Sequence, residues 1–269
     1  MEDLLKLLQN YLLPLGDGGI CVAFSSGADS SVLLKTATGV FDRVLAVTVA
    51  TPLHHIKESE QAALFAESLG VAHAVLEIDE LPELIMSNPP DRCYHCKINM
   101  FGQIIAYARE QGYSHVLDGT NADDLKEYRP GLKAIKELGV LSPLAELGIA
   151  KQDARDIGRQ LGVQSAQKPS SPCMATRFPY GDPLDLNKIS HISRIETYIK
   201  ALGIPIVRAR VHNNLLRIEV EQEMLEKLFS YRSEITALAL REGFDYVTLD
   251  LEGFRSGSMD IPLRKKAKV

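Results

Sequence analysis

The sequence has no apolar run long enough to cross a bilayer, and it carries no excess of positive charge. Its 269 residues are 45% hydrophobic and 24% charged, and the formal net charge is −5. The first residues also lack the positive region, the unbroken apolar stretch and the small-residue cleavage site of a signal peptide. We therefore expect a cytoplasmic protein that does not enter a membrane and has no general attraction for nucleic acid.

Cysteine is scarce, with four residues in the whole chain. In a reducing compartment, a CxxC motif is expected to bind metal or perform redox chemistry rather than form a structural disulfide. Cys21 lies in an apolar stretch, so we expect it to be a small residue of the core. Cys93, Cys96 and Cys173 lie in the turn-rich segments "NPPDRCYHCK" and "KPSSPCMATRFPYG", so we expect them in loops.

Three loop thiols are compatible with several kinds of site. They can hold zinc with a fourth ligand, form a redox disulfide that leaves one thiol over, or bind a [4Fe–4S] cluster with one open iron. His95, inside the CxxC motif, is a further zinc donor, but its spacing from both cysteines makes simultaneous tetrahedral binding awkward. On residue types alone, these alternatives stay open.

Short β-branched runs alternate with helical patterns between residues 19 and 147. The expected strands are "ICVAF", "VLAVTVA", "AHAVLEI" and "SHVLDG", with the helix "CKINMFGQIIAYAREQG" between the last two. Repeats of strand, helix and strand predict parallel strands with right-handed crossovers. We therefore expect an α/β fold with a doubly wound parallel sheet, whose ligands bind beyond the carboxyl ends of the strands.

The pattern changes after the Pro/Ser-rich segment 168–172. A helical pattern at 187–203 is followed by two alternating runs. These runs flank Asn213 and Asn214, residues that tolerate the positive φ of a tight turn. We expect a β-hairpin here.

A long helix from about Glu221 to Glu242 and a strand "DYVTLDL" are expected after the hairpin. Helix, hairpin, helix and strand together indicate a small α+β domain. We therefore expect two domains, at residues 1–168 and 169–269.

The segment "FSSGADSS" follows the first expected strand directly. Its small residues let backbone N–H groups approach an anion, and the helix that begins there presents its positive end. Four hydroxyls add donors to this predicted phosphate site: Ser25, Ser26, Ser30 and Ser31. The lysine of a Walker loop and the spacing of a dinucleotide fingerprint are both missing. An ordinary helix cap is the alternative interpretation, since Ser and Asp are favoured there.

"SSGADS" resembles the SGGxDS loop of the PP-loop ATP pyrophosphatases, with Ser26 in place of the first glycine. These enzymes bind ATP and release pyrophosphate while they adenylate a substrate. The resemblance implies that Ser25, Gly27, Asp29 and Ser30 hold pyrophosphate. It also implies that Asp29 holds Mg²⁺ and takes part in catalysis.

A narrower resemblance runs through most of the chain. The motifs "LDGTNADDLKEYRPG", "RFPYG", "VRARVHN" and "VTLDLEGFRSG" look like those of the LarE family, which inserts sulfur at the expense of ATP in nickel-pincer nucleotide cofactor biosynthesis. That family adenylates a pyridinium carboxylate mononucleotide and then replaces the activated oxygen with sulfur, giving a thiocarboxylate. The resemblance implies the same activity here, and a homo-oligomer such as a hexamer.

Further positions are expected near the nucleotide. Gly119 and Thr120 lie just past a predicted parallel strand. Ala50 follows the second strand and is an expected adenine contact, with a small core residue as the alternative. Three acidic residues are candidates either for metal binding or for favourable charges at a helix N-terminus: Asp123, Asp124 and Glu127.

The segment "IVRARVH" alternates apolar and basic residues. In a strand, three residues would share each face: Val207, Ala209 and Val211 on one, and Arg208, Arg210 and His212 on the other. Arg177 and Arg255 stand beside turns that can bring them near, so the arginines together can grip a phosphate. A solvated strand face is the alternative. The LarE resemblance implies that Arg208, Arg255 and Glu196 recognise the phosphate of the substrate.

The same resemblance bears on the cysteines. The better-known LarE enzymes have a cysteine only at the position of Cys173 and use it as the sulfur donor, which becomes dehydroalanine in a single turnover. Cys93 and Cys96 depart from that pattern. The resemblance to cysteine-rich members and to cluster-dependent thiolation enzymes favours a [4Fe–4S] cluster on all three, whose open iron carries an exogenous sulfide. Sacrificial donation from Cys173 without a cluster is the alternative.

Two other functions fit parts of the sequence. An enzyme of tRNA thiolation would use the same adenylation loop, but the acidic overall charge and the lack of an evident RNA-binding module count against it. A noncatalytic nucleotide or iron–sulfur sensor would bind ATP without releasing pyrophosphate. The expected partner is a small mononucleotide, and neither nucleic acid nor a membrane.

Overall fold

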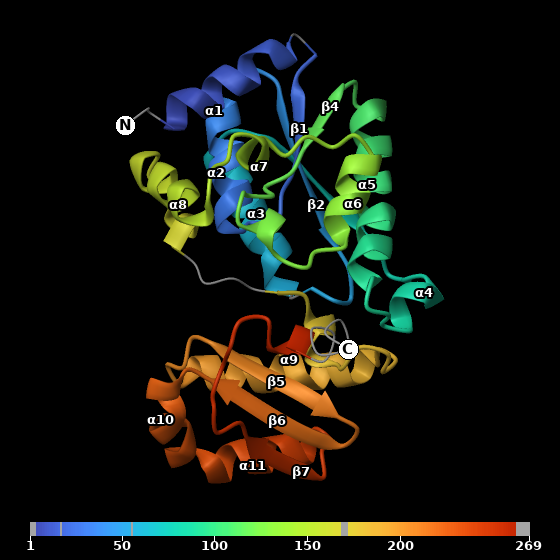
Figure 1. The fold of residues 1–269 in the computed structure, drawn as a ribbon, viewed down its shortest axis with the longest axis vertical. Coiled ribbons are helices and arrows are strands. Elements are labelled where there is room, and N and C mark those ends of the chain that lie inside the picture. Colours follow the sequence, from blue (N-terminus) through green and yellow to red (C-terminus); the bar gives the residue numbers. More distant parts are fainter. Residues whose placement is uncertain (1–3, 17, 55, 168–171, 262–269) are drawn as a thin grey trace. The chain divides into compact units, whose positions relative to one another are not determined.

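A computed structural model describes residues 4–16, 18–54, 56–167 and 172–261 of the chain (Figure 1). The chain forms two compact units. The first contains Met1–Leu81 and Asp91–Ser171, and the second contains Pro82–Pro90 and Pro172–Val269. The domain boundary expected between residues 168 and 169 lies outside the described residues.

The first unit is built on a parallel sheet with the strand order β3-β2-β1-β4. Its strands are β1 (Ile20–Ala23), β2 (Val44–Ala50), β3 (Ala72–Glu77) and β4 (His115–Leu117). Its α-helices are α1 (Leu4–Leu12), α2 (Ala28–Thr38), α3 (Ile56–Ser68), α5 (Arg92–Glu110), α6 (Gly131–Glu137), α7 (Pro143–Glu146) and α8 (Lys151–Gln160).

Both faces of this sheet are covered by helices, so the predicted doubly wound α/β fold is confirmed (Figure 1). Side chains of β1 alternate between the two faces: Ile20 and Val22 pack in the core shared with α1, α2, α3 and α8. Cys21 points to the opposite core, beneath α5 and α6, and is fully buried as expected. The inner strands β1 and β2 are buried on both faces and carry the apolar runs by which the sequence revealed them, whereas the edge strand β3 is partly exposed.

The second unit has a three-stranded sheet with the order β5-β6-β7. Its elements are α4 (Glu83–Met86), α9 (Leu186–Ala201), β5 (Val207–His212), β6 (Leu215–Val220), α10 (Leu225–Ser230), α11 (Arg232–Arg241) and β7 (Tyr246–Leu249). β5 and β6 form the predicted antiparallel hairpin, and Asn213 in its turn has φ 56°. The smaller second sheet in the C-terminal region is therefore confirmed.

The single long helix expected from Glu221 to Glu242 is wrong. The segment forms a short 3-10 turn and two α-helices that are separated at Tyr231, whose backbone leaves the helical region at φ −101° and ψ 16°. Next to the break, the Ser230 hydroxyl donates to the Lys227 carbonyl, a local bond that competes with the helical ladder.

The expectation of loops at Cys93 and Cys96 is also wrong, and the expected helix "CKINMFGQIIAYAREQG", which starts at Cys96, begins too late. Both lie in the first two turns of α5, which begins at Arg92, one residue after the turn-forming prolines, with Asp91 as its N-cap. Prolines restrict the residues before them and stop a helix from extending backward, but they do not prevent one from starting immediately afterwards. Among the described residues, no helix is both long and apolar enough to cross a membrane.

Candidate active site

The loop after β1 forms the centre of the candidate site in the first unit. Gly27 is the N-cap of α2, and Ser26 has φ 54°, in the left-handed region that a glycine adopts without strain. This conformation explains why glycine is the usual residue of the PP-loop at that position. The Ser25 and Ser30 hydroxyls lie 3.2 Å apart, and the Ser30 hydroxyl also donates to the Gly27 carbonyl at 3.3 Å. The loop is therefore a tight turn at the carboxyl end of the central strand.

The loop after β4 approaches the start of α2 closely. A Cβ atom at Gly119 would lie only 2.8 Å from the backbone nitrogen of Ser30 and 3.0 Å from its Cα. The predicted positions Gly119 and Ser30 therefore meet at one edge of the sheet, and glycine is required for this contact.

Asp29 projects from the first turn of α2 into this edge. Asn121 donates to its Oδ2 atom at 3.1 Å, whereas its Oδ1 atom is buried without a hydrogen-bond partner among the described residues. Burial raises the pKa of Asp29, with a further contribution from nearby Asp124, while Asn121 and the charges of Lys151 and Arg155 lower it. A buried carboxylate oxygen with no partner is an expensive feature unless a ligand completes it. As a hard oxygen donor it fits Mg²⁺.

Asn121 is a site residue that the sequence analysis did not single out. Its Oδ1 atom accepts the backbone N–H groups of Asp123 and Asp124, and Asp124 in turn accepts the N–H of Asn121. The signal was present in the segment "TNADD", because Asn followed by Asp is typical of such side-chain turns. Asn121 thereby fixes the loop and presents its amide to Asp29.

The three acidic candidates of this loop already have partners. Asp123 accepts the backbone N–H of Lys151 at 3.0 Å and pairs with Lys126. Arg129 lies 2.9 Å from Asp124 and 3.3 Å from Glu127. These contacts shape the loop and the start of α8.

Thr120 and Ala50 also lie at the carboxyl edge. Buried Asp118 accepts hydrogen bonds from the Thr120 hydroxyl and from Ser142, both at 2.5 Å, so the Thr120 side chain is held within the protein. Ala50 is half-buried, ends β2 and accepts a hydrogen bond from the backbone of Ile78. Its position at a strand end is the one from which a backbone can contact a nucleotide base.

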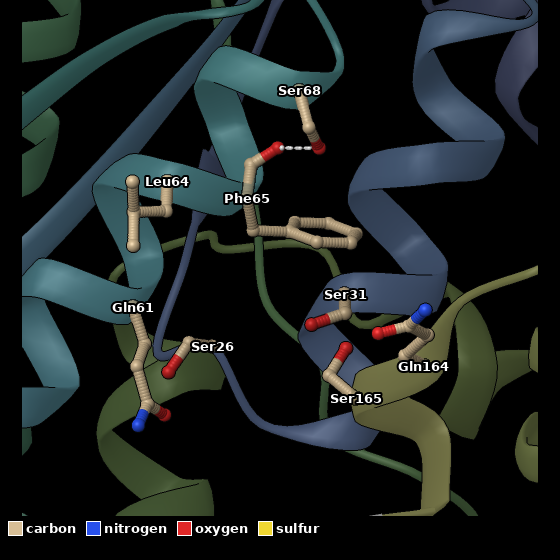
Figure 2. Close-up of a pocket in the computed structure, with 8 residues that line it drawn as sticks. All are labelled: Ser26, Ser31, Gln61, Leu64, Phe65, Ser68, Gln164 and Ser165. Atoms are coloured by element: carbon tan, nitrogen blue, oxygen red, sulfur yellow. Dashed lines mark hydrogen bonds between the residues drawn. The ribbon is translucent and has the colours of Figure 1, made fainter.

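A hollow opens on one side of the phosphate loop, as Figure 2 shows. Its lining comes from the loop, α2, α3 and the 3-10 turn Gln164–Gln167: Ser26, Ser31, Gln61, Leu64, Phe65, Ser68, Gln164 and Ser165. The hydroxyls of Ser31 and Ser165 are buried here without a hydrogen-bond partner among the described residues. The hollow is uncharged and rich in hydrogen-bonding groups.

The second unit has a buried ion pair at its centre. Arg177 donates from two guanidinium nitrogens to the two carboxylate oxygens of Glu196, each at 2.7 Å. Glu196 also accepts the backbone N–H of Ala209 on β5 at 2.9 Å. Burial raises the pKa of Glu196, but these bonds and the Arg177 charge outweigh it, so the net shift is downward. Arg177 thus holds Glu196 ionised and in place.

The arginines of β5 are buried, so the solvated-face interpretation is wrong for them. Arg208 is 6% exposed and Arg210 is 8% exposed. Arg210 pairs with Glu219 of the neighbouring strand at 2.9 Å. Burial, followed by repulsion from Arg177, lowers the pKa of Arg208 to about 10.

Arg208 and the Arg255 segment meet at an aromatic ring. The guanidinium of Arg208 lies over Phe254, 5.1 Å from the ring centroid. Arg255, the next residue, is exposed and pairs with Glu252 at 2.6 Å. A buried arginine beside an exposed one provides two planar donors for an anion, and the position of the buried one is fixed in advance.

The three remaining cysteines are divided between the units. Cys93, exposed, and Cys96, half-buried, stand one turn apart on α5 in the first unit. Cys173, half-buried, precedes a 3-10 turn, Met174–Arg177, in the second unit. No disulfide joins any of the four cysteines, and the described part of the chain contains no group of three His, Cys, Asp or Glu side chains arranged to hold a metal ion. The soft thiol donors fit an iron–sulfur cluster in type and number, if one iron is left open.

Comparison with known proteins gives the family. The model of queuosine biosynthesis protein QueC matches residues 19–92, which include the phosphate loop. An uncharacterized protein of Synechocystis sp. is 39% identical over 91% of this chain and 92% of its own length. The pyridinium-3,5-bisthiocarboxylic acid mononucleotide synthase of Lactiplantibacillus plantarum is 37% identical over 91% of this chain and 90% of its own length. An uncharacterized protein of Methanocaldococcus jannaschii is 32% identical, with 95% and 98% covered. This similarity over nearly the whole length confirms the motif-based prediction, and the chain belongs to the LarE family of ATP-dependent PP-loop enzymes.

Proposed function

We propose that this enzyme adenylates the carboxylate of a pyridinium mononucleotide and then replaces the activated oxygen with sulfur to give a thiocarboxylate. The observation that carries the proposal is the phosphate loop at the carboxyl edge of a parallel sheet, where the Oδ1 atom of Asp29 is buried without a hydrogen-bond partner among the described residues. The name of the Lactiplantibacillus relative supports the substrate class.

The chemistry requires activation before sulfur can enter. A carboxylate repels nucleophiles, and its oxygen is a poor leaving group. When the carboxylate oxygen attacks the α-phosphorus of ATP, the bond to the β-phosphate oxygen breaks and pyrophosphate leaves with the electron pair. The acyl adenylate then has AMP as its leaving group. Mg²⁺ bound at Asp29 would neutralise charge on the phosphates.

Residues of the first unit have distinct tasks in this proposal. Ser25, Gly27 and Ser30 present hydroxyl and backbone N–H groups to the pyrophosphate portion. Gly119 allows the loop after β4 to approach them. Ala50, at the end of β2, and the Thr120 segment, after β4, bound the nucleoside side.

The second unit supplies the substrate grip. Arg208 and Arg255 bind the phosphate of the mononucleotide, because a guanidinium offers paired donors to phosphate oxygens. Glu196 completes this site, and Arg177 acts through Glu196 by holding its carboxylate.

Cytoplasmic location and homo-oligomeric, hexameric assembly remain predictions from the sequence.

Cys173 is the proposed residue of sulfur transfer, and together with Cys93 and Cys96 it would hold a [4Fe–4S] cluster. Such a cluster supplies an iron at which exogenous sulfide is held. The protein's part is to provide three thiolates, two from α5 and one from the Cys173 segment.

The products formed from ATP test the proposed activity. With ATP, Mg²⁺ and the mononucleotide carboxylate, the enzyme should form AMP and pyrophosphate, and ADP with orthophosphate would refute the proposal. Asp29→Asn should lower the adenylation rate by about two to three orders of magnitude, because it removes charge where the phosphates develop theirs. Asp79→Asn, at an exposed position, is the matched control. A near-normal rate for Asp29→Asn would remove this residue from the chemistry.

A further inference from the structure

The phosphate loop lacks the positive charge that its ligand demands. ATP brings several negative charges to the loop, and residues 24–31 contain neither lysine nor arginine. Walker loops meet the same demand with a lysine inside the motif. A cation from another element must therefore face this site if the β- and γ-phosphates are to be neutralised by protein side chains.

α8 is the element that supplies cations near the phosphate loop. It packs against α2, with Ala154 and Ile157 in the same core cluster as Val32 and Leu33 (Figure 1). The first residue of α8 is Lys151.

Hydrogen bonds tie the start of α8 to the loop after β4. The Lys151 N–H donates to Asp123 at 3.0 Å, and the Ala122 N–H donates to the Ile149 carbonyl at 2.9 Å. Through Asn121, the same loop reaches Asp29. A short chain of hydrogen bonds through Asp123 and Asn121 thus connects the backbone of Lys151 to the Asp29 carboxylate.

Arg155 stands one turn beyond Lys151, on the same side of α8. Its Nε atom is buried without a hydrogen-bond partner among the described residues. Both positive charges act on Asp29 and lower the pKa of that carboxyl against the effect of burial. The third cation of the helix differs, since Arg159 is exposed and is bonded to Asp156.

We infer that Lys151 and Arg155 bind the β- and γ-phosphates of ATP, and hence the pyrophosphate that leaves, from the α8 side of the loop. The inference rests on the proposed adenylation and adds two residues to it. The planar guanidinium of Arg155 can bond two phosphate oxygens, and the ammonium of Lys151 acts as a compact charge. In the bond-breaking step, both cations stabilise the electron pair that moves onto the oxygen of pyrophosphate.

The experiment measures pyrophosphate binding to the full-length protein by calorimetry, with Mg²⁺ present. Lys151→Met and Arg155→Met should each weaken binding by about tenfold, and the double variant should weaken it further, because each loses a charge-assisted contact. Arg155→Lys should recover part of the loss, since it restores charge without the fork. Arg159→Met is the matched control and should bind like the wild type.

AMP binding separates a phosphate role from damage to the fold. It should change less than twofold, on the order of a few tenths of a kcal/mol, in both variants, with the melting temperature unchanged. Wild-type pyrophosphate affinity in the variants would overturn the inference, as would an equal loss of AMP binding. Because pyrophosphate binding does not depend on turnover, the result stands apart from the activity test: an enzyme that released ADP would refute adenylation while leaving these affinities interpretable.

Discussion

Two carboxylates of this chain, half-buried Asp29 and fully buried Glu196, have opposite surroundings. Asp29 has one bonded and one unbonded oxygen, and burial raises its pKa. Glu196 has both oxygens bonded by Arg177 and Ala209, and its pKa is lowered on balance. The first arrangement costs stability and suits a ligand, whereas the second fixes a side chain in a single position.

Glu196→Gln should destabilise the protein strongly, by about 3–5 kcal/mol, since it leaves the buried Arg177 charge without its partner. The folded-state pKa of Glu196 is below its ordinary value, so its contribution is present above pH 4.5 and is lost as the pH falls through the folded-state pKa. Urea unfolding at several pH values would measure both effects. The wild type should lose more stability than the variant on acidification, and Glu83→Gln, at an exposed position, should behave like the wild type. Equal acid sensitivity of the two proteins would contradict the role of the pair.

At the residue scale, the alternating sequence of β5 predicted which side chains share a face of the strand. It did not predict that both faces are buried. Val207, Ala209 and Val211 are buried as the strand pattern of β5 predicted. The burial of Arg208 and Arg210 depends on Glu196, Glu219 and Phe254, which come from other elements. A single strand contains no information on what covers its second face, so the sequence pattern alone left a solvated face open.

At the scale of elements, the strands were better defined by the sequence than the helix limits. Each expected strand of the first unit is present at the expected place. The inner strands β1 and β2 are buried, and such strands are continuous apolar runs between polar turns. The start of α5 and the break between α10 and α11 were missed. Both helix limits depend on hydrogen bonds of the backbone at a few residues. Residues of similar helix propensity can either continue a helix or end it, so the sequence pattern does not fix these limits.

The contact between the β4 loop and the α2 N-terminus can be tested with a matched pair of glycines. Gly119→Ala should lower ATP affinity at least tenfold, on the order of 1.4 kcal/mol, because its Cβ would lie 2.8 Å from the Ser30 nitrogen and displace the phosphate loop. Gly102→Ala, in the middle of α5 with open space around its Cβ, should leave ATP binding unchanged and raise stability by about 0.5–1 kcal/mol. Nucleotide titration and thermal unfolding of both variants are the measurements. Unchanged ATP binding by Gly119→Ala would show that the loop tolerates the displacement.

At the scale of the whole molecule, the proposed activities are divided between two compact units. The phosphate loop, Cys93 and Cys96 belong to the first, and Arg208 and Cys173 belong to the second. Because the short segment Pro82–Pro90 returns to the second unit, neither unit is one continuous piece of chain. Adenylation and sulfur transfer must therefore be separated by point substitutions in the full-length protein.

The last prediction concerns the source of sulfur. If Cys93, Cys96 and Cys173 jointly hold a cluster, alanine at any one of them should remove most of the iron and acid-labile sulfide and abolish sulfur transfer. Adenylation should remain detectable in all three variants, because ATP binds at the loop after β1. Cys21→Ala is the control, since this cysteine is buried in the core and its pKa is raised to about 12 by burial.

Turnover distinguishes this mechanism from sacrifice of Cys173. Anaerobically reconstituted protein supplied with sulfide should complete more than one turnover per chain, because the donor sulfur is then renewed and no protein sulfur is consumed. Sacrifice predicts a different result: Cys93→Ala and Cys96→Ala stay active, transfer stops after one sulfur per chain, and Cys173 loses the mass of hydrogen sulfide as it becomes dehydroalanine. Product counting and intact-protein mass spectrometry on the same sample decide between them. A single turnover with the dehydroalanine mass would refute the cluster mechanism. Cys93 and Cys96 of α5 would then have another role.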